Sequence, residues 1–200
     1  MLLSVLFETP TDERQDMTTT DPTPRTTPDS APSAAPAGER ADLLEALAVH
    51  RGFLRQTVRG LTEEQARQRT TVSALTLGGL VKHVAATERQ WADFIEQGPA
   101  AFATGPDAQV VWAGGFQLLP DETLAGVLET YEQVARRTDA LVRSLPDLDL
   151  THPLPPAPWS APGATQSARR VLLHVIAETS QHAGHADILR ESLDGARTMG

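Results

Sequence analysis

The chain has 200 residues, of which 40% are hydrophobic, and its formal net charge is -9 at pH 7. A chain of this size and hydrophobicity is long enough for one ordinary core and short for two. Its negative charge repels polyanions, so we expect neither nucleic acid nor an anionic membrane surface as a partner. Because the chain has no cysteine, it has no disulfide and no thiolate metal site, and any thiol chemistry requires an external thiol.

Residues 1–38 predict a disordered tail. After a short apolar start they are mostly Thr, Pro, Asp, Ser and Ala without an apolar period. The apolar surface that they could bury is too small to outweigh the conformational entropy lost on ordering. The apolar start has no basic segment before it and no cleavage signal after it, and no stretch approaches the roughly 20 apolar residues of a membrane span. We therefore expect a cytoplasmic protein without a membrane partner, folded over residues 39–197.

Helical periodicity dominates the rest of the chain, and nothing in it reads as a run of alternating strands. The short second segment begins with Thr-Glu-Glu-Gln, which resembles a capping box. The segment that ends before Pro146 is the clearest, because its apolar residues recur every three or four positions. We predict helices over residues 40–59, 62–69, 76–97, 124–145 and 165–193.

The four long segments are amphipathic and are separated by Pro- and Gly-rich connections, which predicts an all-α fold, a four-helix bundle. Two of the connections are long, namely Gly98–Pro120 and the Pro-rich loop before the last helix. Each is long enough to cross the length of a bundle, so the helices do not have to follow a simple up-down-up-down order.

The last predicted helix places polar groups on an apolar face. With about 100° per residue, Glu178, His182, His185 and His174 fall on the same face as Val175. Burying a carboxylate and several imidazoles without partners would cost several kcal/mol, and a simple core would use Leu or Ile at these positions. A cation is the simplest group that would compensate them.

A divalent metal ion is the cation that this pattern indicates. Glu178 and His182 are four residues apart, so both can reach one ion, and His83, which faces inward on its helix, can supply a third ligand. Three ligands leave a coordination position open for water or a substrate, as in catalytic sites. The spacing alone fits a surface hydrogen bond or ion pair equally well, and either His174 or His185 could replace one of the three ligands.

Two motifs resemble the DinB/YfiT-like metalloprotein superfamily, namely LVKHVAATERQW at residues 80–91 and ETSQHAGHADILR at residues 178–190. The resemblance covers about residues 39–192 and implies a four-helix bundle of DinB/YfiT type, often a homodimer, with a three-ligand site for zinc or nickel. Many members use three histidines, whereas Glu178 here resembles the mycothiol-dependent maleylpyruvate isomerase. The resemblance thus implies His83, Glu178 and His182 as ligands, with His185 as a candidate to support a ligand or face the substrate.

The same resemblance implies thiol chemistry, because relatives include that isomerase and bacillithiol or glutathione transferases. We therefore expect a metal-dependent transferase or isomerase whose partners are a small thiol, mycothiol or bacillithiol, and an electrophile. Two other classes stay open. One is a metal-dependent hydrolase or oxygenase with the same His/Glu/His site, and the other is a stress-related binding module with a structural metal.

Aromatic residues fall into two groups. We expect Trp91 and Tyr131, which lie at helical spacing, to belong to the core. Trp112 and Trp159 lie in the long connections, where burial is less automatic, and they suggest a loop lid over the metal. For His152, in the Pro-rich loop, we expect an ordinary surface or partly buried role.

Overall fold

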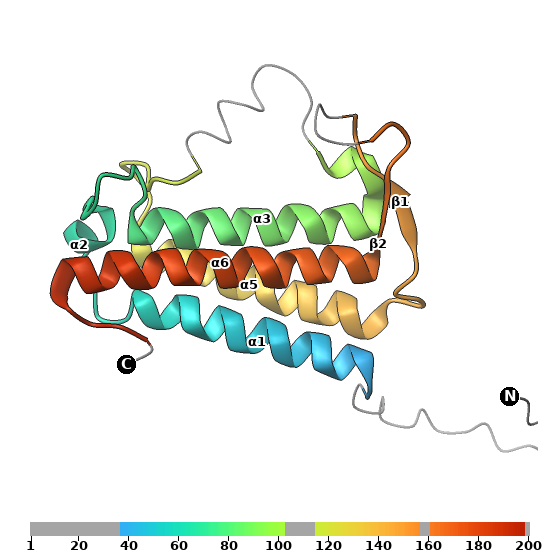
Figure 1. Cartoon of the computed structure of the whole chain (residues 1–200), viewed down its shortest axis with the longest axis horizontal. Helices are drawn as coiled ribbons and strands as arrows, with labels where there is room; N and C mark the ends of the chain where they lie inside the picture. The colour runs from blue at the N-terminus through green and yellow to red at the C-terminus, as the bar shows by residue number, and fades with distance from the viewer. Residues whose placement is uncertain (1–36, 103–114, 157–160, 199–200) are drawn as a thin grey trace, which may run out of the picture. The chain divides into compact units, whose positions relative to one another are not determined.

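The computed structural model describes residues 37–102, 115–156 and 161–198 (Figure 1). The predicted tail before residue 37 and both tryptophans of the predicted lid, Trp112 and Trp159, lie outside these residues. The regular structure of the described part consists of helices and one pair of short strands, which confirms the all-α prediction. None of the described helices combines the length and the apolarity needed to cross a lipid bilayer.

The helices begin and end close to their predicted boundaries. Thr62 forms the predicted capping box, since its hydroxyl accepts a hydrogen bond from Gln65 N–H and the Gln65 side chain accepts one from Thr62 N–H. Threonine hydroxyls also cap α3 and α5, and a serine hydroxyl caps α6. The helices are α1 (Glu39–Thr57), α2 (Glu63–Arg67), α3 (Leu77–Gln97), the 3-10 helix η1 (Gly98–Ala101), α5 (Leu124–Ser144) and α6 (Ala168–Asp194).

The short strands correct the prediction, which contained none. Strand β1 (Thr151–Pro153) pairs antiparallel with β2 (Thr165–Ser167), and His152 therefore lies in a strand rather than a loop. The last helix begins at Ala168 instead of 165, because Ser167 caps it and the preceding residues bond to β1. Strands of three residues are too short to produce a visible alternation of apolar and polar side chains.

The helix order departs from up-down-up-down. Helices α3 and α5 run in the same direction, and α1 and α6 run opposite to them (Figure 1). The main packing partners of α6 are α1 and α3, and α3 also packs on α5. The long connection before α5 is required for this order, as the sequence allowed.

Two apolar clusters fill the bundle, one toward each end. One includes Leu54, Leu80 and Tyr131, and the other includes Leu47, Phe94 and Leu172. Each of the four long helices adds residues to both clusters, and a buried polar residue lies between these two sets along the helix. The four polar residues are Arg51, Glu88, Thr138 and Thr179. The candidate site lies next to this polar layer, where α3 faces α6.

Candidate metal centre

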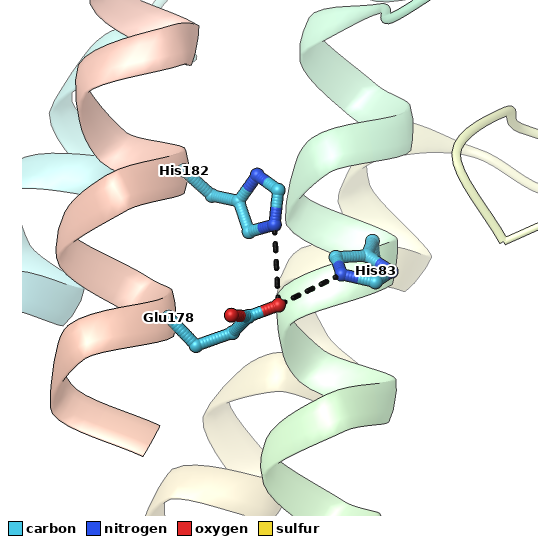
Figure 2. A group of neighbouring side chains, drawn as sticks. All are labelled: His83, Glu178 and His182. Carbon is cyan, nitrogen blue, oxygen red and sulfur yellow. Dashed lines mark hydrogen bonds and ion pairs between the residues drawn. The ribbon is translucent and has the colours of Figure 1, made fainter. Parts of the chain in front are cut away.

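Three side chains from two helices point toward one another at the α3/α6 interface (Figure 2). His83 comes from α3, whereas Glu178 and His182 lie on successive turns of α6. The side chains meet because each helix carries its polar residues on the face that packs against the other helix. These are the three residues that the sequence motifs indicated as candidate ligands.

The distances suit a divalent ion. Both His83 Nε2 and His182 Nε2 approach the same oxygen, Glu178 Oε1, at 3.4 Å and 3.3 Å. One possible ligand atom from each residue lies within 4.8 Å of the other two. Tetrahedral zinc with bonds of about 2.0 to 2.2 Å holds its ligand atoms roughly 3.3 to 3.6 Å apart. The three residues could therefore hold a metal with little rearrangement.

The protonation of the two imidazoles also suits a metal. Burial lowers the pKa of His83 below its ordinary value, although the hydrogen bond and attraction to Glu178 oppose this. Burial lowers the pKa of His182 as well, and the nearby His83 adds to the effect. Both rings are therefore neutral at pH 7, which is the state that binds a metal ion.

Burial is uneven across the three residues. The His83 side chain is 7% exposed, that of His182 12% and that of Glu178 22%. Since Glu178 is the most accessible of them, the site lies at the edge of the core and not at its centre. A small molecule could approach it from outside the bundle, which a structural metal would not require.

His185 lies behind His182, away from the carboxylate. Its Nδ1 is 3.4 Å from Nδ1 of His182, the ring nitrogen that does not face Glu178. Metal-binding histidines commonly use one nitrogen for the ion and the other for a hydrogen bond that orients the ring. His185 is thus placed to orient His182. Neither His185 nor His174 belongs to the group of three residues that could hold the ion.

Phe116 covers the other histidine. Its ring stacks on that of His83, with centroids 4.0 Å apart and planes at 21°, and lies 6.0 Å from the ring of His182. The Thr87 hydroxyl lies 3.5 Å from His83 Nε2. These contacts restrict the rotation of His83 and leave its Nε2 directed toward Glu178.

A pair of glycines on α3 lets the segment that carries Phe116 come this close. A Cβ at Gly79 would lie 1.8 Å from the Phe116 carbonyl oxygen, and one at Gly78 would lie 2.5 Å from Leu118 Cδ1. Arg67 holds the following residues by donating hydrogen bonds to three backbone carbonyls, those of Leu118, Leu119 and Glu122. The sequence analysis missed this arrangement, although Gly-Gly in the first turn of a helix signals a close backbone approach.

A second polar cluster in the bundle was also missed. Arg51 Nη2 lies 2.5 Å from Glu88 Oε1, and Arg51 Nη1 lies 2.8 Å from Asp139 Oδ1. The Glu88 side chain is 0% exposed and that of Arg51 is 5% exposed. The three residues come from α1, α3 and α5, so no spacing within one helix could have revealed them.

A hollow lies elsewhere on the bundle, between α1 and α5. Its volume is about 690 Å³, and Gly52, Val58, Leu124 and Leu128 are among the residues that line it. None of the three candidate ligands contributes to it. Among the described residues, the group whose ligand atoms converge closely enough to hold a metal ion is the one at the α3/α6 interface, so we place the candidate site there.

Comparison with known proteins agrees with the two motifs. A family model described as Mycothiol-S-transferase matches residues 42–195, which is most of the chain and runs from the first turn of α1 to the end of α6. A search of curated proteins finds no match. The chain belongs to the mycothiol S-transferase family, within the DinB-like superfamily that the sequence resembles.

Proposed function

We propose that the protein is a metal-dependent S-transferase, in which His83, Glu178 and His182 hold a divalent ion and mycothiol or a related small thiol is the cosubstrate. The observation that carries the proposal is the convergence of two imidazole nitrogens on one carboxylate oxygen at 3.4 Å and 3.3 Å. Among the described residues, Glu178 contacts these two imidazoles and forms no ion pair with a lysine or arginine. A carboxylate in this position favours a cation from outside the chain.

His83, Glu178 and His182 would hold the divalent ion, which would lower the pKa of a bound thiol so that the thiolate is present at neutral pH. The chain supplies no thiol of its own because it has no cysteine. The membership of the mycothiol S-transferase family supports an external one. The cosubstrate loses its proton to solvent, and its sulfur then bonds to the carbon of an electrophile as that carbon releases a leaving group with the bonding electrons.

The residues of the site divide this work. His83, Glu178 and His182 contribute the ligand atoms, and zinc or nickel is the ion that we expect. His185 orients His182 through the Nδ1 contact, and Phe116 does the same for His83 by stacking. Glu178 is the most exposed of the three ligands, so we expect the substrates to approach past its side of the site.

The first experiment tests the site. Elemental analysis and titration calorimetry with zinc and nickel would be applied to the wild type, to His83→Ala and to His182→Ala. His50→Ala is the matched control, because His50 lies on α1 against Phe53 and takes no part in the group. We expect one ion per chain in the wild type and the control, and loss of binding in the other two. Equal binding in all four would contradict the proposal.

The second experiment tests the reaction. The metal-loaded protein would be incubated with mycothiol, bacillithiol or glutathione and a panel of electrophiles, and thioether formation would be measured. We expect a rate above that of the metal-free protein with at least one of these thiols. No increase with any of them, for protein that binds its metal, would exclude the transferase.

The same ligand set is found in other enzymes, since two histidines and a carboxylate also bind the iron of oxygenases and the zinc of some hydrolases. Iron in the purified protein together with oxygen consumption would favour an oxygenase. If a chelator lowers the melting temperature steeply while no thiol raises it, the metal has only a structural role. A homodimer and a cytoplasmic location stay predictions.

A further inference from the structure

The interface that carries the three candidate ligands continues beyond them. Trp91 lies two turns after His83 on α3, and His174 lies one turn before Glu178 on α6. The two rings meet across the interface in an edge-to-face arrangement, with centroids 4.9 Å apart and planes at 77°. Because α3 and α6 run in opposite directions, this pair lies beside the three ligands on the side toward the C-terminal end of α3 (Figure 1).

The ring nitrogens of His174 are the second feature of this end of the interface. In the described part of the chain no residue forms a hydrogen bond with either of its ring nitrogens, whereas His152, His182 and His185 each have such a contact. The His174 side chain is half-buried, but its ring nitrogens are not among the fully buried polar atoms that lack a hydrogen-bond partner. They therefore keep some contact with solvent. A donor held in place and accessible from outside can bind a ligand.

Trp91 provides a rigid apolar surface next to this donor. Its ring lies 5.5 Å from that of Phe94 and 5.1 Å from that of Phe102, both at steep angles. These contacts hold the indole in one orientation. The pair therefore presents one apolar ring and one polar ring to the same space.

The charge around His174 favours an anion. Burial lowers its pKa, an effect that Glu178 opposes and that Arg170 reinforces. Arg170 lies one turn before His174 on α6, is exposed, and forms no ion pair with an acid of the described residues. Once Glu178 is neutralised by an ion, as in the proposed function, a cation and a neutral imidazole remain at this end of the interface.

We propose that His174, Arg170 and Trp91 form the binding subsite for the electrophile, and that this electrophile carries a carboxylate. The carboxylate accepts hydrogen bonds from His174 and Arg170, and the apolar part of the molecule packs on Trp91. This arrangement directs the reacting carbon toward the thiol sulfur at the neighbouring site. The inference rests on the proposed function, because it assigns the second substrate of the same reaction.

Two alkylating reagents of nearly equal shape test the charge preference, namely iodoacetate and iodoacetamide. In both reactions the sulfur of mycothiol bonds to the methylene carbon, iodide leaves with the bonding electrons, and the thiol proton passes to the buffer. Since the chain has no cysteine, the reagents have no protein thiol to modify. Rates would be expressed relative to the reaction without protein, for the zinc-loaded wild type, His174→Gln and Arg170→Gln.

We expect the wild type to accelerate the reaction of iodoacetate at least about tenfold more than that of iodoacetamide, as a charge-assisted hydrogen bond would do. His174→Gln and Arg170→Gln should each lower kcat/KM for iodoacetate about tenfold and change that for iodoacetamide less than about twofold. Arg136→Gln, which removes the same charge from an exposed position on α5, is the control and should have no effect. Zinc stoichiometry in each variant confirms that the ligands are intact.

The outcomes separate the two proposals. If the zinc-loaded wild type accelerates neither reagent, the wider panel of thiols and electrophiles decides the proposed function, and calorimetry with S-carboxymethyl and S-carbamidomethyl mycothiol decides the subsite. Tighter binding of the carboxymethyl product that is lost in His174→Gln and Arg170→Gln supports it. If the wild type is active but the variants lose activity toward both reagents equally, or toward neither, the proposed subsite is wrong.

Discussion

The bundle contains two polar clusters side by side in its middle, and they balance their charges in different ways. In the first, the carboxylate of Glu88 is fully buried and both of its oxygens pair with Arg51, which also reaches Asp139. In the second, the Glu178 carboxylate contacts the imidazoles of His83 and His182 and has no lysine or arginine partner among the described residues. Burial lowers the pKa of both rings, so neither carries the positive charge that Arg51 carries.

This difference separates a structural cluster from a binding site. A carboxylate inside a bundle requires a positive partner, and the first cluster contains one from the chain itself. The second cluster contains no lysine or arginine from the part of the chain that the structure describes, and it lies at the edge of the core, where the Glu178 side chain is 22% exposed. Polar residues in a core are thus informative about function when the chain does not neutralise them.

The largest effect should follow from breaking the first cluster. Glu88→Gln leaves Arg51 buried with Asp139 as its remaining partner, and we expect the free energy of unfolding to fall by about 3 to 5 kcal/mol in urea denaturation. The double variant Arg51→Met/Glu88→Leu, which removes both charges, should recover much of this loss. A fall below about 1 kcal/mol for Glu88→Gln would mean that this cluster does not stabilise the bundle.

The corresponding substitution in the second cluster, Glu178→Gln, should weaken metal binding and should not destabilise the fold. Without metal, Glu178→Gln should leave the free energy of unfolding unchanged or raise it, because it removes a carboxylate that pairs with no described lysine or arginine. With zinc at 100 times its dissociation constant, the wild type should gain about 2.7 kcal/mol, and the variant should gain much less. Thermal denaturation with and without zinc measures both effects. Equal gains in the two proteins would remove Glu178 from the ligand set.

A smaller effect should come from displacing the ring that covers His83. Gly79→Ala places a methyl group against the Phe116 carbonyl, so the segment has to move, and we expect a loss of about 1 to 3 kcal/mol in stability together with weaker zinc binding. Gly52→Ala is the matched control. A Cβ at Gly52 meets no atom within 4 Å, so this exposed change on α1 should be neutral or slightly stabilising. Unchanged zinc affinity in Gly79→Ala would show that the contact with Phe116 does not orient His83.

The smallest effect should be the pH dependence of the metal-free protein. Burial lowers the pKa of His83, His174 and His182 in the folded state, so the unfolded chain binds more protons just below the ordinary pKa of 6.5. Stability should therefore fall as the pH decreases from 7 through this range, by at most about 1.4 kcal/mol per pH unit for each histidine. His182→Gln should make the dependence less steep when unfolding is measured at several pH values. An equal slope in both proteins would contradict the lowered pKa of His182.

Most of the fold was predictable because helix periodicity and capping are local. The hydroxyls of Thr62 and Thr76 begin helices where the sequence placed them, and Tyr131 is fully buried as expected. The strands were missed because three residues carry too little pattern, and their pairing joins segments that are separated by a long connection. The start of the last helix was wrong for the same reason.

The candidate site was predictable in part. The spacing alone places Glu178 and His182 on one helix face. The prediction that His83 is the third ligand depended on its inward position on its helix and on the family motif. No spacing could assign Phe116 to His83, or Arg51 to Glu88, because these partners come from different elements. The pair of His174 and Trp91 was equally hidden, although each residue was noted separately.

The sequence by itself determined which residues form helices, which face of each helix is apolar, and that a carboxylate and imidazoles interrupt the apolar face of the last one. These properties follow from the order of residues along a single helix. Only the tertiary structure decided which polar groups meet, which of them receive a cation from the chain and which do not. The distance between side chains on different helices depends on the register and direction in which those helices pack, and packing is decided by the whole core at once.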